Sequence, residues 1–307
     1  MAIATYMGDA RLSNKDFEAI FLAEWDARLD EVMPLVRELN LNNTDRYRYG
    51  ESVMGVVVAP KSNENGQTKF FAPHPGKDVY ITTDIHKFGM RCSQEYREFG
   101  KGDYARFPAH MVEVMDYTVK TKVFNMYNVA FDVASPNKYD GKPLCATDHP
   151  LAGGGVASNT LATAADLNEQ SFEAACELML RTPTEDGVMT QRYVPARLVT
   201  SIAKWGDNLR QTRSTFTTHT QNERGPNVPN VSRDAFGIQS FFHPMMLSAD
   251  DWFVQAAQSP IVIVWSRRPT LYGGVPDIEQ NIDWIAKMQL AVVADTWRGI
   301  VGVQGTA

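Results

Sequence analysis

The chain has 307 residues, of which 44% are hydrophobic and 21% charged, and its formal net charge at pH 7 is −6. This length predicts one large domain or two closely joined domains. The mean hydropathy of −0.30 and the lack of any apolar run near the ~20 residues that span a bilayer argue against a membrane protein. The acidic balance argues against a protein that grips nucleic acid through a basic surface, and the N-terminal residues show no secretory signal, so we expect synthesis for use in a cytoplasm.

Residues 13–39 are expected to form a helical arm that bends, if anywhere, at Pro34. Ser13 is a candidate N-cap, with Asp16 three positions later. Apolar residues then recur at helical spacing, namely Phe17, Ile20, Phe21, Trp25, Leu29 and Val32. A segment with strand and turn character follows, so the apolar stripe is expected to meet a partner elsewhere in the molecule or on another subunit.

From Tyr47 to Thr83 the pattern changes to short β-prone runs separated by polar turns. Asn65-Gly66 is a turn signal between strand-like runs, so a long β-hairpin is predicted over residues 46–86. A two-stranded ribbon is only marginally stable alone, and a contact with another subunit is one way to cover it. The candidate contact residues at its tip are Lys61, Asn63, Glu64, Asn65 and Gly66.

Residues 103–131 carry the longest helical signal in the chain. The helix is expected to open after Pro108 and to continue for about 22 residues, or about 33 Å. Its apolar positions three or four apart are Met111, Met115, Val119, Val123, Met126 and Ala130. A methionine stripe can line a promiscuous groove, but core packing is the favoured interpretation.

The second half of the chain alternates helices and strands. The expected elements are a helix over 166–181, a strand over 197–202, a short helix over 205–212, strands over 252–256 and 260–266, and a closing pair of strands within 284–305. Residues 217–234 are rich in Asn, Pro, Gly and Arg, so we expect an exposed loop there. Its candidate intersubunit contacts are Asn222, Arg224 and Gly225.

The stretch 140–160, DGKPLCATDHPLAGGGVASNT, concentrates the residues that could carry chemistry. Cys145, Asp148 and His149 include zinc-ligand types, but they crowd into five positions between prolines and no second cluster supplies a fourth ligand. A Cys145–His149 nucleophile lacks a third group and an oxyanion hole. Gly153–Gly155 lack the lysine of a phosphate-binding loop. We therefore interpret Asp148 and His149 as loop formers, assign backbone freedom to the glycines, and expect replacement of Cys145 and His149 by alanine to leave assembly intact.

No other pattern indicates catalysis. The cysteines Cys92, Cys145 and Cys176 are odd in number and form no C-x-x-C pair, so they are expected to be reduced, buried thiols. The histidines His74, His86, His110, His219 and His243 are scattered. Arg267-Arg268 follows a strand-like run and favours a salt bridge over a phosphate contact. We expect no catalytic residue, no cofactor and no bound metal.

Three motifs in order along the chain resemble one family. They are FGMRCSQEYREFGKGD at 88–103, DGKPLCATDHPLAGGGVASNTLATAADL at 140–167 and WRGIVGVQG at 297–305. Together with the long helix and the single helix between them, they resemble the major capsid protein of tailed bacteriophages. The resemblance extends from about Tyr47 to the C-terminus, and the arm matches only in being helical.

The resemblance implies an α+β protein of the Hong Kong 97-type fold. Its implied parts are an N-terminal arm at 1–45, an extended hairpin or E-loop at 46–86, a P-domain at 87–150 and 263–290 with a spine helix at about 108–130, and an A-domain at 151–262 and 291–307. The implied function is a structural major capsid protein whose copies assemble through hexamers and pentamers into an icosahedral head. The implied partners are further copies, portal and scaffolding or cement proteins, and packaged double-stranded DNA bound without sequence specificity. The implied location is the virion, after synthesis in the host cytoplasm.

Two alternatives remain open at this stage. An encapsulin-like compartment would share the fold and enclose cargo enzymes, whereas a soluble hydrolase would use Cys145 and His149. Relatives with a long N-terminal scaffolding extension differ from this short arm, which implies a separate scaffold or none. Lys61 and Lys69 lie in the predicted hairpin, but no motif identifies a cross-linking partner, so we expect no particular covalent link.

Overall fold

The computed structural model describes residues 14–29, 31–41, 46–49, 79–93, 106–136, 139–184, 187–189, 192–214, 235–276 and 281–306. The chain divides into two compact units. The first draws on residues 1–47, 81–123 and 263–292, and the second on residues 48–80, 124–262 and 293–307. Among the described residues, no helix is both long enough and apolar enough to cross a membrane.

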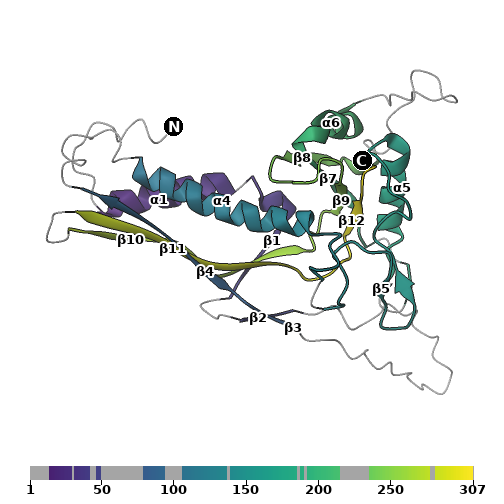
Figure 1. Cartoon of the computed structure of the whole chain (residues 1–307), viewed down its shortest axis with the longest axis horizontal. Helices are drawn as coiled ribbons and strands as arrows, with labels where there is room; N and C mark the ends of the chain where they lie inside the picture. The colour runs from purple at the N-terminus through teal and green to yellow at the C-terminus, as the bar shows by residue number, and fades with distance from the viewer. Residues whose placement is uncertain are drawn as a thin grey trace, which may run out of the picture. The chain divides into compact units, whose positions relative to one another are not determined.

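The described residues form both helices and strands (Figure 1). The helices are α1 (Asn14–Leu29), η2 (Met33–Leu35), α4 (Phe107–Asn128), α5 (Glu169–Leu180), η3 (Ile202–Lys204) and α6 (Trp205–Arg213). The strands are β1 (Arg37–Asn40), β2 (Arg46–Tyr49), β3 (Val79–Thr82), β4 (Asp84–Cys92), β5 (His149–Pro150), β6 (Val156–Ala157), β7 (Pro195–Ser201), β8 (Gln239–His243), β9 (Trp252–Ala256), β10 (Ile261–Pro276), β11 (Ile282–Ala294) and β12 (Ile300–Val303).

The first unit contains a four-stranded sheet in the order β1-β10-β11-β4. Alternate residues of β11 are buried, as expected when one face of a sheet packs on other elements. Phe17 of α1 stacks on Trp284 of β11, with ring centroids 4.7 Å apart, and Trp25 meets Trp265 of β10 edge-on. The apolar stripe of the arm therefore packs against a sheet of its own chain.

The helix predicted for the N-terminal arm, residues 13–39, is too long. α1 ends at Leu29, and β1 occupies residues that we expected to be helical. Pro34 lacks a backbone N–H and disfavours the helical conformation in the residue before it. It fits the first turn of the short η2 helix, and Val36 then adopts an extended conformation at φ −133° and ψ 165°. The chain thus turns into a strand rather than bending within one helix.

Helix α4 confirms the helix predicted after Pro108, with its end at Asn128. Its stripe residues Met111, Met115, Val119, Val123 and Ala130 just beyond it are buried, so core packing of the methionines is confirmed for two of them. In the first unit, Lys120 is almost buried, contacts Glu31 and lies 2.9 Å from Asp116 Oδ2. This ion cluster joins the segment after α1 to α4.

The second unit is built on a four-stranded sheet in the order β12-β9-β7-β8. β7 pairs with β8 in parallel and with β9 antiparallel. Every residue of β9 is buried. Helix α5 begins at the N-cap Asn168, whose side chain accepts from Ser171 N, and it packs on the sheet through Phe172, Ala175 and Met179. The predicted helices and strands of this region are confirmed within a few residues of their ends.

The two closing strands that we predicted are confirmed, but they lie in different sheets. β11 pairs with β4, and β12 pairs with β9 in the other sheet. The turn between β11 and β12 therefore carries the chain from one sheet to another, which periodicity alone does not reveal.

β2 and β3 pair at the base of the predicted hairpin. Residues 50–78 lie outside the described residues, and they include the candidate contacts Lys61, Asn63, Glu64, Asn65 and Gly66. Residues 215–234 lie outside them too, with Asn222, Arg224 and Gly225. The hairpin tip and the exposed loop therefore stay predictions.

Candidate functional site

His149 lies at the centre of a buried polar network in the second unit. Its side chain is fully buried. Nδ1 lies 2.7 Å from Asp140 Oδ2, and Nε2 lies 3.0 Å from Asn159 Oδ1. The interpretation of His149 as a loop former is therefore wrong, because its ring is clamped between two acceptors inside the fold.

Asn159 connects three segments of the second unit. Its Nδ2 donates to the carbonyls of Leu144 at 2.8 Å, Trp297 at 3.2 Å and Ile300 at 3.1 Å. Three carbonyls around this nitrogen fix the orientation of the amide. Oδ1 therefore faces the other way, where it accepts from Ala146 N at 2.9 Å and from His149 Nε2. The backbone of Asn159 also pairs with Ala146 and Gly302.

The network joins the motif at 140–167 to the motif at 297–305. The ring of His149 stacks on that of Trp297, with centroids 4.5 Å apart and planes 5° from parallel. The Arg298 guanidinium lies 4.4 Å from the centre of the same indole and donates from Nε to Pro183 O at 2.8 Å. Burial lowers the pKa of Arg298 to about 10. The HPLAGGG and WRG motifs thus form one structural junction.

Cys145 packs where a nucleophile would be inaccessible. Its side chain is buried, and its N–H donates to Ala130 O at 2.7 Å. A Cβ added to Gly302 would lie only 2.5 Å from Cys145 Sγ and 2.8 Å from Phe131 Cζ, so only glycine fits at that position. Burial raises the pKa of the Cys145 thiol far above its ordinary value, which suppresses the reactive thiolate.

The described residues contain no cluster of three His, Cys, Asp or Glu side chains that could hold a metal ion. Asp148 points instead to Lys142, its ion-pair partner. Arg268 forms the expected salt bridge, because its Nη2 lies 2.8 Å from Glu38 Oε2, but it lies inside β10, which continues to Pro276, rather than at a strand end.

The glycine run forms a tight turn between β5 and β6. Gly154 has φ +94° and Gly155 has φ +90°, values that residues with a Cβ rarely adopt. Gly154 N donates to Leu151 O at 3.0 Å, and Leu151 N donates to Gly155 O at 3.1 Å. The backbone freedom that we assigned to Gly153–Gly155 is confirmed at Gly154 and Gly155.

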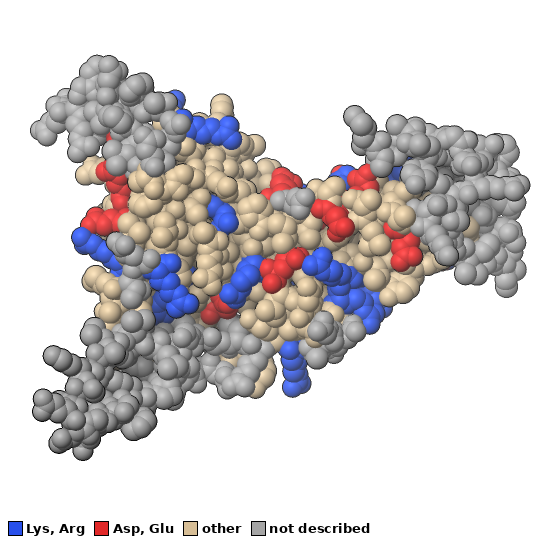
Figure 2. Space-filling model, turned by 180° about the vertical axis from the view of Figure 1, so that it is seen from behind, with Lys and Arg blue, Asp and Glu red and all other residues tan. Residues whose placement is uncertain are grey.

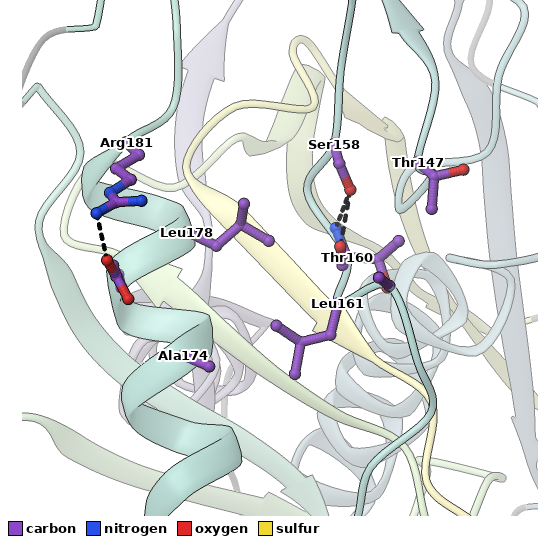
Figure 3. A pocket seen from close by; sticks show the side chains of 9 residues that line it. Thr147, Ser158, Thr160, Leu161, Ala174, Leu178 and Arg181 are labelled. Atoms are coloured by element: carbon purple, nitrogen blue, oxygen red, sulfur yellow. Dashed lines mark hydrogen bonds and ion pairs between the residues drawn. The ribbon is translucent and has the colours of Figure 1, made fainter.

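A groove of about 390 Å³ opens beside this junction, between α5 and residues 158–162. Figure 3 shows Ala174 and Leu178 of α5 on one wall and Leu161 on the other. On its rim, Arg181 Nη2 lies 2.5 Å from Glu177 Oε1, and both side chains are exposed. Sequence reasoning missed this groove, because its walls come from a helix and an irregular segment.

A model of the phage capsid protein family matches residues 76–303. The chain belongs to the phage capsid protein family. It is a structural protein rather than an enzyme, copies of it assemble into capsid shells, and its place is the virion.

Solved structures share the fold at low sequence identity. The virus-like particle from Pyrococcus furiosus has a TM-score of 0.56 at 8% identity, covering 94% of this chain and 98% of that one. The capsid of a native GTA particle has a TM-score of 0.56 at 12% identity, covering 90% of each chain. The cyanophage P-SCSP1u capsid has a TM-score of 0.56 at 10% identity, covering 89% of this chain and 86% of that one. No curated protein matches the sequence.

The phage capsid protein has the α+β, Hong Kong 97-type fold that the motifs implied. The family match does not favour the encapsulin-like or the hydrolase alternative. The burial of Cys145 and His149 gives an independent physical reason against the hydrolase, because a substrate could not reach either side chain.

Proposed function

We propose that this capsid protein forms hexamers and pentamers that close into an icosahedral head around double-stranded DNA. The match of the family model to residues 76–303 carries the proposal. Heterologous contacts between identical subunits generate rings when the rotation between neighbours closes, and mixing two ring sizes allows a closed shell. Portal and scaffolding or cement proteins are the further partners that we propose, and the host cytoplasm is the proposed place of synthesis.

The proposed packaging requires an inner capsid wall that encloses DNA without binding it tightly. The net charge of −6 supports such a wall, because tight binding to phosphates needs clustered cations. On the face shown in Figure 2, the visible blue and red side chains are interspersed. This pattern fits weak contacts that do not depend on DNA sequence.

The proposed parts of the subunit are the arm at 1–45, the extended hairpin at 46–86, the P-domain at 87–150 and 263–290, and the A-domain at 151–262 and 291–307. The spine helix of the P-domain corresponds to α4. Residues 124–150 belong to the second compact unit. Within the proposed P-domain, this is therefore the segment that packs together with the proposed A-domain.

Deletion of the hairpin tip tests the proposed assembly. The tip at residues 61–67 is polar, so removing it is expected to leave circular dichroism and subunit melting nearly unchanged. The shell should weaken, because a loss of about 1.4 kcal/mol is tenfold in each pairwise equilibrium and is compounded across a closed lattice. The matched control replaces the same residues with a Gly/Ser linker of equal length, which separates loss of contacts from loss of reach.

Sedimentation and electron microscopy read out the result. The deletion variant should shift from particles to capsomers or monomers, and wild-type particles should contain nuclease-protected DNA when they are isolated from infected cells. Wild-type particles from the deletion variant, with unchanged shell stability, would show that the hairpin is not an assembly element. Wild-type protein that forms no shells would overturn the proposed function itself.

A further inference from the structure

An exposed apolar cluster lies at the C-terminal ends of β7 and β8. It consists of Ile202, Trp205 and Phe242, which are 53%, 55% and 40% exposed. The register pairs Thr200 with Phe242, and β7 continues directly into η3 and α6, both of which contact β8. A tryptophan left half in water beside other apolar groups is typical of an anchor in a protein–protein interface.

Asn208 holds this cluster in place. Its Nδ2 donates to Leu198 O at 3.1 Å, Thr200 Oγ1 at 2.9 Å and Phe241 O at 2.9 Å. These bonds tie α6 to both β7 and β8, so Trp205, one turn earlier on α6, projects from a fixed base. Because Trp205 is already held in place, little conformational freedom is lost on its side of the contact when a partner binds.

The groove beside α5 offers a complementary surface within the same unit. Its walls are formed by Leu161, Ala162, Ala174 and Leu178, and its volume of about 390 Å³ falls in the range of ~300–1,000 Å³ found for pockets that enclose organic molecules. Ala162 and Ala174 contribute only small side chains to the lining, and Figure 3 shows Leu161 and Leu178 on the two walls.

We infer that Trp205 of one copy inserts into the α5 groove of a neighbouring copy. The occupant is a second copy because this protein assembles into shells of itself. Each surface also carries one ion pair of its own chain. Asp207 and Arg210 lie 3.0 Å apart on α6, and Glu177 and Arg181 form the rim of the groove.

Repeated around a ring, this contact is heterologous, because each copy offers Trp205 to one neighbour and its α5 groove to another. A heterologous contact repeats from copy to copy until a ring closes. A tryptophan buries about 150–250 Å² in all, well below the ~800 Å² per partner of a standard interface. The contact is therefore an anchor within a larger interface. The inference that it repeats around a closed ring of subunits rests on the proposed hexamers and pentamers.

Disulfide trapping tests this placement without changing Trp205. Ala203 on η3 and Ala162 at the groove are both exposed, so the variant carries Ala203→Cys together with Ala162→Cys. Purified shells are oxidised mildly with copper–phenanthroline, and each single variant serves as the control. The double variant is expected to give a ladder of dimers and larger oligomers on a non-reducing gel, whereas the single variants give none. Shells of the double variant without that ladder overturn the inference but leave the proposed function intact.

Trp205→Ala supplies the second measurement. It is expected to lower the yield of shells at least tenfold while the melting temperature of the isolated subunit stays within about 2 °C of wild type. The matched control is Tyr117→Ala on α4, an equally exposed aromatic residue in the first unit, which should leave shell yield unchanged. Wild-type shell yield from Trp205→Ala, or a large drop in subunit melting, overturns the inference. If wild-type protein forms no shells, the proposed function fails instead.

Discussion

Replacement of Asn159 by alanine is expected to be among the most damaging single changes in the second unit. The side chain is almost wholly buried. Its loss would leave the carbonyls of Leu144, Trp297 and Ile300 without their amide donor, and would leave His149 Nε2 without its acceptor. A buried polar group without a partner costs about 1–3 kcal/mol. Water entering the cavity relieves part of the sum, so we expect a total loss of about 4–5 kcal/mol.

Urea unfolding of the isolated subunit, followed by circular dichroism, measures this loss. For a unit of this size it corresponds to about 8–20 °C in melting temperature. The matched control is Asn168→Ala, which removes the N-cap of α5 and should cost only about 1 kcal/mol. Asn159→Asp keeps the shape but places an oxygen against the three carbonyls, so it should be as harmful as alanine. A loss for Asn159→Ala no greater than that for Asn168→Ala would refute the reasoning.

Two further expectations concern the glycine turn and the buried cysteines. Gly154→Val and Gly155→Val should each lower the melting temperature and the particle yield, because φ values of +94° and +90° strain a β-branched residue by about 1–3 kcal/mol. The control Gly153→Val should be nearly neutral. Equal effects at all three sites would contradict this expectation. Cys92, Cys145 and Cys176 are all buried, and burial raises the pKa of Cys145 and raises that of Cys176 to about 12. Ellman's reagent at pH 8 should therefore modify none of the 3 cysteines in the native subunit and all of them in urea. Rapid modification of Cys145 in the native subunit would show that this thiol is accessible.

The long helix and the core strands could be predicted because their signals are local. Pro108 suits the first turn of α4, and apolar residues three and four apart continue along one face. The end of the arm could not be placed so easily. Val32 and Leu35 continue an apolar helical pattern and are indeed buried, but Pro34 changes the backbone between them. Burial was therefore predictable at Val32, whereas the conformation that buries it was not.

The polar junction was not predictable for a different reason. Asn159 donates to Ile300, which lies 141 residues further along the chain, and neither residue stands out by type. The family resemblance rested on both motifs but did not predict that they touch, because the spacing of residues in a sequence does not show which residues are in contact. His149 was misread since a histidine before a proline in a glycine-rich stretch resembles a surface turn, whereas its partners come from Asp140 and Asn159.

Buried backbone carbonyls explain why this junction is polar. Leu144, Trp297 and Ile300 present carbonyls that accept from the Asn159 amide, and a buried carbonyl needs a donor. An apolar side chain at position 159 would fill the space but satisfy none of them. Asn159 satisfies all three and also orients His149, which stacks on Trp297. Because such a network tolerates only one arrangement, it fixes β12 against the segment that leads to Leu161 and the α5 groove. A shell held by many weak contacts needs that fixed geometry, since each subunit must present the same surface to every neighbour.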